Sequence, residues 1–231
     1  MQFNSWPLGK LPPELMRSEL EQARALGYEY DDPRDLIKIF EQQVAEFSGS
    51  KYAVAVDTCS NALFLCLKYF DRSSGDVITI PKRTYVSVPM QIKHAGYFCE
   101  FEDLEWSGVY RLKPYPIWDG AVRWKRGMYQ GGLHVLSFQL KKRIPIGKGG
   151  MVLTDDPEIA EWLKLATYDG RDLTTTYGDP GHVKMLGWHY YMEPESAARG
   201  LILMDKIKGE GDSGNWSMYP DVEVMLRSIN E

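Results

Sequence analysis

Residues 137–156 read SFQLKKRIPIGKGGMVLTDD, and this segment is the most informative one in the chain about its architecture. It ends one apolar strand, crosses a basic turn and enters a second strand through Gly149 and Gly150. Paired glycines before a strand indicate a point where the backbone bends tightly or approaches another group closely. By composition alone the segment would be a hairpin with solvated lysines, so its meaning depends on the surrounding sequence.

On both sides of this segment, short apolar strands alternate with helices. Strands are predicted at 51–58, 73–81, 97–103, 114–121, 133–139 and 149–156, and helices at 14–27, 33–47, 60–70, 85–96 and 157–168. This alternation predicts an α/β fold with a mixed, mostly parallel sheet between helices. The polar stretch 169–182 is expected to be a long loop, and such loops in compact domains are often functional.

Composition narrows the class of protein. The net charge of −5 argues against a general nucleic-acid binder, which usually carries a basic face. Cys59, Cys66 and Cys99 lack CxxC spacing, which favours reduced thiols in a cytosolic protein. No apolar run approaches membrane-spanning length, and residues 1–10 lack the apolar core of a signal peptide. The expected location is the cytoplasm, with neither nucleic acid nor membrane as a partner.

Three features together suggest a site for pyridoxal phosphate (PLP). One is a lysine of the basic segment, and the other two lie outside that segment. Asp119 ends a strand, where parallel-sheet enzymes place functional side chains. Thr58, Cys59 and Ser60 join a strand to a helix N-terminus, where free N–H groups and the helix dipole attract anions. A strand-end carboxylate, a strand-end lysine and a phosphate cradle are the minimum set for this cofactor. Without the other motifs, Asp119 would be interpreted as a strand-end turn former.

Five motifs then follow one another in the order typical of one family. FEQQVAEFSGSKYAVAVDTCSNAL (40–63) resembles FExxxAEYLG-KYAVAVNSGTDAL, and VITIPKRTYVSVPMQIKHAG (77–96) resembles VIVPSFTFVATANAI-AGA. WDGA (118–121) matches EDAA, LSFQLKKRIPIGKGG (136–150) matches FSF-xxK-xxxxGEGG, and GWHYYMEPESAARGL (187–201) resembles GYNYRMSELQAAIGL. The chain thus resembles the DegT/DnrJ/EryC1/StrS family of PLP-dependent sugar aminotransferases, which have fold type I.

The resemblance implies roles for individual residues. Lys142 falls at the lysine that forms the Schiff base with PLP and later moves protons. Asp119 falls at the carboxylate that keeps the pyridine nitrogen protonated, so that the ring can act as an electron sink. Tyr85 falls at the aromatic ring against the face of the cofactor, and Ser137 at a serine that meets the phosphate. Lys141 is interpreted as a solvated neighbour.

Several positions depart from the family pattern. Cys59 and Ser60 replace the Gly-Thr of the phosphate turn, which is tolerable because backbone N–H groups provide much of the grip. Val122 replaces an amide or histidine, so a polar contact is missing there. His189 replaces the asparagine that a partner subunit lends to the phosphate, and Tyr191 replaces the adjacent arginine. Histidine can still donate a hydrogen bond to a phosphate, although it could equally be a residue of no special role.

The chain also resembles the family in a shortened form. Only about ten residues, 104–113, lie where family members have a further helix and strand, and about 30 follow Leu201 where members continue into a C-terminal domain. The expected organisation is an N-terminal arm and helix at 1–32, a PLP-binding α/β domain at 33–208, and a short tail at 209–231 in place of the usual small domain.

The resemblance implies amino transfer to a keto sugar, nucleotide-linked, from an amino-acid donor such as glutamate, in a homodimer with shared active sites. Two alternatives stay open. One is another PLP reaction, such as the decarboxylation or elimination of an amino acid, because substrate orientation over the ring selects the bond that breaks. The other is a PLP-binding protein with little catalysis, against which the presence of both Asp119 and Lys142 argues.

Overall fold

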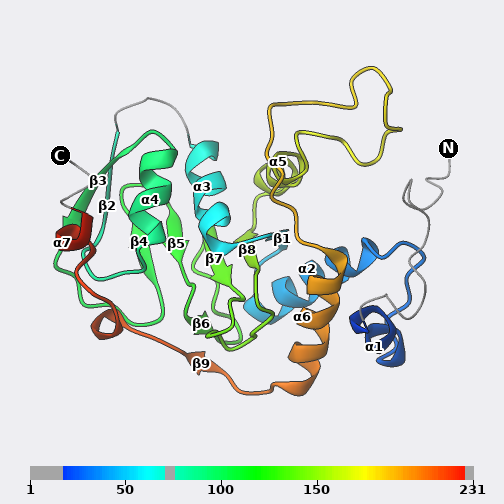
Figure 1. Cartoon of the computed structure of the whole chain (residues 1–231), viewed down its shortest axis with the longest axis horizontal. Coiled ribbons are helices and arrows are strands. Elements are labelled where there is room, and N and C mark those ends of the chain that lie inside the picture. The colour runs from blue at the N-terminus through cyan, green and yellow to red at the C-terminus, as the bar shows by residue number, and fades with distance from the viewer. Residues whose placement is uncertain (1–17, 71–75, 227–231) are drawn as a thin grey trace.

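A computed structural model describes residues 18–70 and 76–226 (Figure 1). Its main sheet has five strands in the order β1 (Tyr52–Val56), β8 (Gly150–Thr154), β7 (Leu133–Ser137), β5 (Ile117–Asp119) and β4 (Tyr110–Leu112). Beyond β4 lie β2 (Val77–Pro81) and β3 (Phe98–Glu102), joined to it through a bridge between Thr79 and Lys113. A short pair, β6 (Arg123–Trp124) and β9 (Gly211–Asp212), lies apart from this sheet.

The directions of the strands confirm a mixed sheet in which most strands run the same way. β5 is parallel to β7, β2 is parallel to β3, and β8 is antiparallel to both β1 and β7. β4 is antiparallel to β5, and the bridge that links it to β2 is also antiparallel. Thus β1, β2, β3, β5 and β7 point one way, and only β4 and β8 point the other way. The carboxyl ends of β1, β5 and β7 therefore meet at one edge.

Strand β4 was not predicted, and its direction has a simple cause. Only residues 103–109 separate β3 from β4. A crossover to a parallel strand needs a dozen or more residues, usually with a helix. The connection here is too short for that, so the chain turns at the carboxyl edge and returns antiparallel. Residues 113–116 then lead back into β5 as a hairpin.

Helices cover both faces of the sheet. Their bounds are α1 (Glu19–Ala25), α2 (Asp35–Ser48), α3 (Cys59–Tyr69), α4 (Ser87–His94), α5 (Pro157–Thr167), α6 (Pro194–Lys206) and α7 (Val222–Leu226). Alternate side chains of each strand enter two separate cores. Val54 and Val135 pack with α3, α4 and α5, whereas Ala55 and Leu136 pack with α1, α2 and α6. Side chains therefore bury the sheet on both faces, as the nearly continuous apolar strands require.

The predicted helices are confirmed with small shifts at their ends. The helix expected at 14–27 is α1 at Glu19–Ala25, and Gly27 follows it with φ +91°. Residues 14–17 of that prediction lie outside the described residues. α6 was not predicted as an element. The tail contains a 3-10 turn at Trp216–Met218 and α7. Within the described ranges, no helix is long and apolar enough to cross a membrane.

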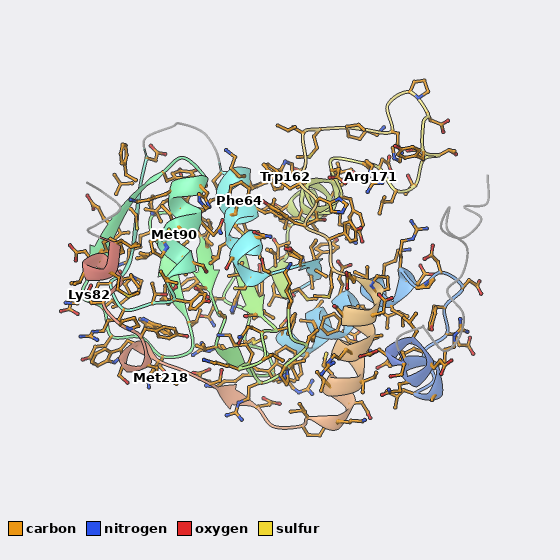
Figure 2. All side chains as sticks on the ribbon, viewed as in Figure 1. Phe64, Lys82, Met90, Trp162, Arg171 and Met218 are labelled. Carbon is orange, nitrogen blue, oxygen red and sulfur yellow. The ribbon has the colours of Figure 1, made fainter. Side chains whose placement is uncertain are left out.

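The tail runs back along the carboxyl edge of the sheet rather than away from the body (Figure 1). β9 pairs with β6, Trp216 N donates to Trp106 O at 3.0 Å, and Val222 N donates to Lys82 O at 2.8 Å. In Figure 2, Lys82 lies beside α7 and Met218 lies at the 3-10 turn. Residues 211–222 therefore pass close to the point where β5 ends.

Candidate active site

The site is built where three parallel strands end. Val56 of β1 leads into Thr58, Asp119 is the last residue of β5, and Ser137 is the last residue of β7. The first residue of β8, Gly150, pairs with both Val56 and Ser137. Functional groups that are up to 79 residues apart in sequence (Thr58 and Ser137) are thus placed on one edge, as the strand-end positions in the sequence predicted.

Asp119 is buried, with 5% of its surface exposed. Its Oδ1 accepts from the N–H of Ala121 at 2.9 Å and its Oδ2 accepts from the hydroxyl of Tyr110 at 2.6 Å. Burial raises the pKa of Asp119, while these two donors and the charge of Lys142 oppose that rise. An ionised carboxylate has about four lone-pair sites, so each oxygen keeps one for a further donor.

Lys142 is the lysine that lies within electrostatic reach of this carboxylate. Its charge acts on both Asp119 and Cys59, and its side chain is half-buried. Its backbone N–H donates to Gln139 O at 2.8 Å, which closes the turn after β7. Lys141 is exposed, and Lys148 pairs with Asp57 at 3.2 Å with 70% of its side chain exposed. The geometry therefore favours Lys142 among the lysines of this segment.

The turn at Thr58, Cys59 and Ser60 has the features of an anion cradle. Thr58 is the N-cap of α3, and its Oγ1 accepts from Asn61 N at 3.0 Å. The hydroxyls of Ser60 and Ser87, the latter at the start of α4, lie 2.7 Å apart. The early N–H groups of α3 have no partner within the helix and point out of its N-terminus.

Gly150 makes this cradle possible. A Cβ on Gly150 would lie 2.4 Å from Cys59 N and 2.5 Å from Thr58 C, and both are backbone atoms that cannot move aside. The close approach predicted for the paired glycines is confirmed here. The site thus has a backbone cradle with two hydroxyls at one end and a buried carboxylate near a lysine at the other. The cradle fits the phosphate of PLP, and the carboxylate fits its pyridine nitrogen.

The remaining predicted residues fall in different places. Ser137 lines a small cavity together with Lys142, and its Oγ accepts from Gln139 N at 3.5 Å. Tyr85 is 60% exposed and stands at the same edge, where its charge would act on Tyr219. A 60% exposed phenol has surface available for stacking. The roles of both residues toward a cofactor stay predictions.

His189 lies in the segment after α5, next to Tyr190, whose O accepts from Asp57 N at 2.7 Å just beyond the end of β1. Its Nδ1 is 2.9 Å from Asp169 Oδ2, and its ring meets Tyr191 edge to face at 4.7 Å between centroids. Tyr191 stacks on Tyr168 at 4.7 Å. These contacts do not bring His189 to the site of its own chain, so its predicted role depends on a second subunit.

Four residues at the site were missed from the sequence, and one of them is Ser87, whose hydroxyl lies 2.7 Å from that of Ser60. Tyr110 and Thr84 join Asp119 in a hydrogen-bonded chain, with Thr84 Oγ1 and the Tyr110 hydroxyl 2.5 Å apart. Tyr219 belongs to the tail; burial raises its pKa to about 12, and the charges of Asp119 and Cys59 contribute. The short connection at 104–113 could have indicated Tyr110. It is too short for a crossover, so the residues within it had to return antiparallel beside β5. No sequence signal indicated Tyr219.

Two substitutions in the WDGAV segment have packing explanations. A Cβ on Gly120 would lie 2.0 Å from Nε2 of His134, so the glycine that stands for the family's alanine makes room for that ring. Burial lowers the pKa of His134 to about 3, so it is neutral. Val122 is 6% exposed and packs against Gly214 of the tail. Val122 therefore fills an apolar contact where the family pattern has a polar side chain.

Comparison with known proteins agrees with this architecture. The model of the DegT/DnrJ/EryC1/StrS aminotransferase family matches residues 29–110 and 125–213. The chain therefore belongs to that family, whose members are PLP-dependent aminotransferases. Residues 111–124, which include Asp119, lie between the two matched parts. The hairpin from β4 into β5 lies at this interruption of the match.

Individual relatives are distant. The chain is 27% identical over 203 residues to the spore coat polysaccharide biosynthesis protein SpsC of Bacillus subtilis, covering 68% of this chain and 51% of the relative. It is 25% identical over 211 residues to GDP-perosamine synthase of Caulobacter vibrioides, covering 73% and 56%. The chain thus spans about half the length of these relatives.

A solved structure shows the same fold. The crystal structure of AtS13 from Actinomadura melliaura superposes with a TM-score of 0.70 at 20% identity, covering 82% of this chain and 64% of that one. At that identity the likeness concerns the fold alone, and it confirms the fold-type-I α/β architecture predicted from the sequence.

Proposed function

We propose that this protein is a PLP-dependent aminotransferase that transfers an amino group from an amino-acid donor such as glutamate to a nucleotide-linked keto sugar. The observation that carries the proposal is the convergence of Asp119, Lys142 and the α3 N-terminus at one sheet edge. Membership of an aminotransferase family supports the reaction type. The naming of one relative as a GDP-perosamine synthase supports a sugar nucleotide as the acceptor.

Each group has a distinct task in this proposal. Lys142 would hold the cofactor covalently. Once the substrate amine has displaced it, the free lysine amine would move a proton at the substrate carbon. Asp119 would pair with the pyridine nitrogen, and the α3 N-terminus with Ser60 would bind the phosphate. Bound PLP supplies an electron sink for the bond that breaks. Tyr85 and Ser137 would contact the ring face and the phosphate.

A specific observation keeps another PLP reaction as the second candidate. Val122 replaces a polar side chain at the site and is packed into an apolar contact with the tail, so substrate orientation here can differ from that in relatives. Because orientation over the cofactor selects the bond that breaks, decarboxylation or elimination of an amino acid would use the same Lys142 and Asp119.

A half-reaction separates these functions. The purified chain, loaded with PLP, should convert to the pyridoxamine phosphate form when glutamate is added, with release of 2-oxoglutarate. A nucleotide-linked 4-keto sugar should then restore the original absorption spectrum. PLP in free solution at the same concentration is the control. Release of carbon dioxide from an amino acid would instead establish the second candidate, and no conversion by any amine would reject amino transfer.

We further propose that the working unit is a homodimer in the cytoplasm. The part of the chain after α5 exposes apolar side chains, including Tyr177 at 69%, Val183 at 61% and Leu186 at 86%. Figure 1 shows this segment reaching out from the body of the fold. Symmetric self-association is the commonest way to bury such surface. In such a dimer His189 would reach the partner's phosphate site rather than its own.

Subunit mixing tests the shared site. His189→Ala chains and Lys142→Ala chains, each nearly inactive alone, should regain about a quarter of the wild-type activity when mixed in equal amounts, because about half of the dimers are then mixed and one of the two sites of each mixed dimer carries neither lesion. A mixture of Asp119→Ala and Lys142→Ala chains is the matched control, since both lesions act within their own chain and no intact site can form. Absence of recovery in a mixture shown to exchange subunits would contradict the shared site.

A further inference from the structure

The reversed strand β4 brings an unexpected phenol to the strand-end carboxylate. β4 and β5 pair so that Tyr110 stands directly opposite Asp119. Directly opposite residues of an antiparallel pair point to the same face of the sheet, with Cβ atoms about 4.5–5.5 Å apart. If a crossover had made β4 parallel to β5, this cross-strand pair would not exist. The contact is thus a product of the short 103–109 connection.

The proton positions in this cluster follow from its chemistry. The Tyr110 hydroxyl lies 2.6 Å from Asp119 Oδ2 and 2.5 Å from Thr84 Oγ1. An ionised carboxylate only accepts, so Tyr110 must donate its single proton to Asp119. Thr84 must then donate to the Tyr110 oxygen. Thr84, Tyr110 and Asp119 are 2%, 4% and 5% exposed, so water does not compete for these bonds.

The other groups around Asp119 do not duplicate this contact. Lys142 acts on Asp119 through its charge, from the turn after β7, and Asp119 in turn raises the pKa of the Cys59 thiol at the start of α3. Tyr219 of the tail also lies within electrostatic range. The backbone N–H of Ala121 binds the opposite oxygen, Oδ1, at 2.9 Å. Tyr110 is the side-chain donor that fixes Oδ2.

We propose that Tyr110 is a positioning residue of the active site: its hydroxyl, itself oriented by Thr84, locks the Asp119 carboxylate in one rotamer and holds it ionised for the pyridine nitrogen of PLP. This inference rests on the proposed function for its last step. Two donors on opposite oxygens fix the plane of the carboxylate, and the remaining lone pairs then face the site. A charge-assisted hydrogen bond in a buried site also offsets the burial that favours the neutral acid.

The test measures the ionisation of Asp119 itself in the full-length chain. Carbon-13 labelling of aspartate carboxyl groups, with Asp119→Asn for assignment, gives the titration of Asp119 by NMR in cofactor-free protein. Tyr110→Phe should move this titration to higher pH, since it removes one donor from the ionised form. Tyr97→Phe is the matched control: Tyr97 is equally buried at 4%, and its hydroxyl donates to Leu67 O at 3.1 Å, away from this cluster. It should leave the titration of Asp119 unchanged.

A second variant tests the same hydrogen-bonded chain in case Tyr110→Phe does not fold. Thr84→Val preserves the shape and removes only the donor to the Tyr110 oxygen, so it should move the titration in the same direction by less. Tyr110→Phe should also weaken PLP binding about tenfold relative to Tyr97→Phe, the usual effect of losing a hydrogen bond to a charged group. An unchanged Asp119 titration in folded Tyr110→Phe protein, or in Thr84→Val protein should the former not fold, overturns the proposal.

The two proposals fail in different ways. If PLP does not bind at Lys142, the proposed function fails, yet the NMR titration still decides whether Tyr110 controls Asp119. If PLP binds at Lys142 and glutamate converts it, but Tyr110→Phe matches Tyr97→Phe in both titration and affinity, only the role of Tyr110 is rejected.

Discussion

Lys142→Ala is expected to abolish covalent attachment of PLP and to lower turnover by about a thousandfold or more, because one side chain supplies both the nucleophile and the proton transfer. The half-burial of Lys142 beside Asp119 and Cys59 sets it apart from its neighbours. Borohydride reduction of the loaded protein followed by peptide mapping should place the pyridoxyl group on Lys142. Reduction before and after substitution measures attachment independently of the reaction catalysed.

Lys141→Ala provides the matched control for this experiment. It removes the same side chain one residue away, where the lysine is exposed and its backbone N–H caps the turn by donating to Gln139 Oε1 at 2.8 Å. Turnover and labelling should stay within about twofold of wild type, as for most surface substitutions. Labelling on Lys141 or on Lys148 would contradict the assignment, even if the protein proved to bind PLP.

Much of the fold could be predicted from local sequence pattern. YAVAV (52–56), which lies between Lys51 and Asp57, became β1, and LHVLS (133–137), which follows Gly131 and Gly132, became β7. Strand β4, with three residues, is too short to show any periodicity. Its presence and direction depend on the length of the connection before it and on pairing with β5, which are tertiary effects.

The candidate site divides in the same way. Asp119, Lys142 and the Thr58 turn were predictable because a strand end or a helix start is visible in the sequence next to each residue. Tyr110 and Tyr219 enter the site from β4 and from the tail, and their nearest partners are set by packing between segments. The buried hydroxyls of Tyr110 and Thr84 have no neighbouring residue in the sequence that indicates their burial, because the partner of each hydroxyl lies elsewhere in the chain.

Asp119→Asn is expected to lower turnover by about 10²–10⁴-fold while PLP still attaches to Lys142. The substitution keeps the size of the side chain and removes the charge that would hold the pyridine nitrogen protonated, whereas Lys142 and the α3 N-terminus still grip the cofactor. Asp155→Asn makes the same change of charge beyond the far end of β8, at an exposed carboxylate, and should leave turnover nearly unchanged.

The pH dependence of the wild-type protein gives an independent check on the same carboxylate. Burial raises the pKa of Asp119 above its usual range. Because the ionised form is the active one, turnover should fall as the pH drops through the pKa that Asp119 has in the loaded protein, where the charge of the pyridinium opposes the effect of burial. Tyr110→Phe should move this acid limb to still higher pH, since the donor that favours the ionised form is gone. Near-wild-type turnover in Asp119→Asn would show that the charge of Asp119 does not drive the chemistry. An acid limb that Tyr110→Phe leaves in place would reject the role of Tyr110 alone.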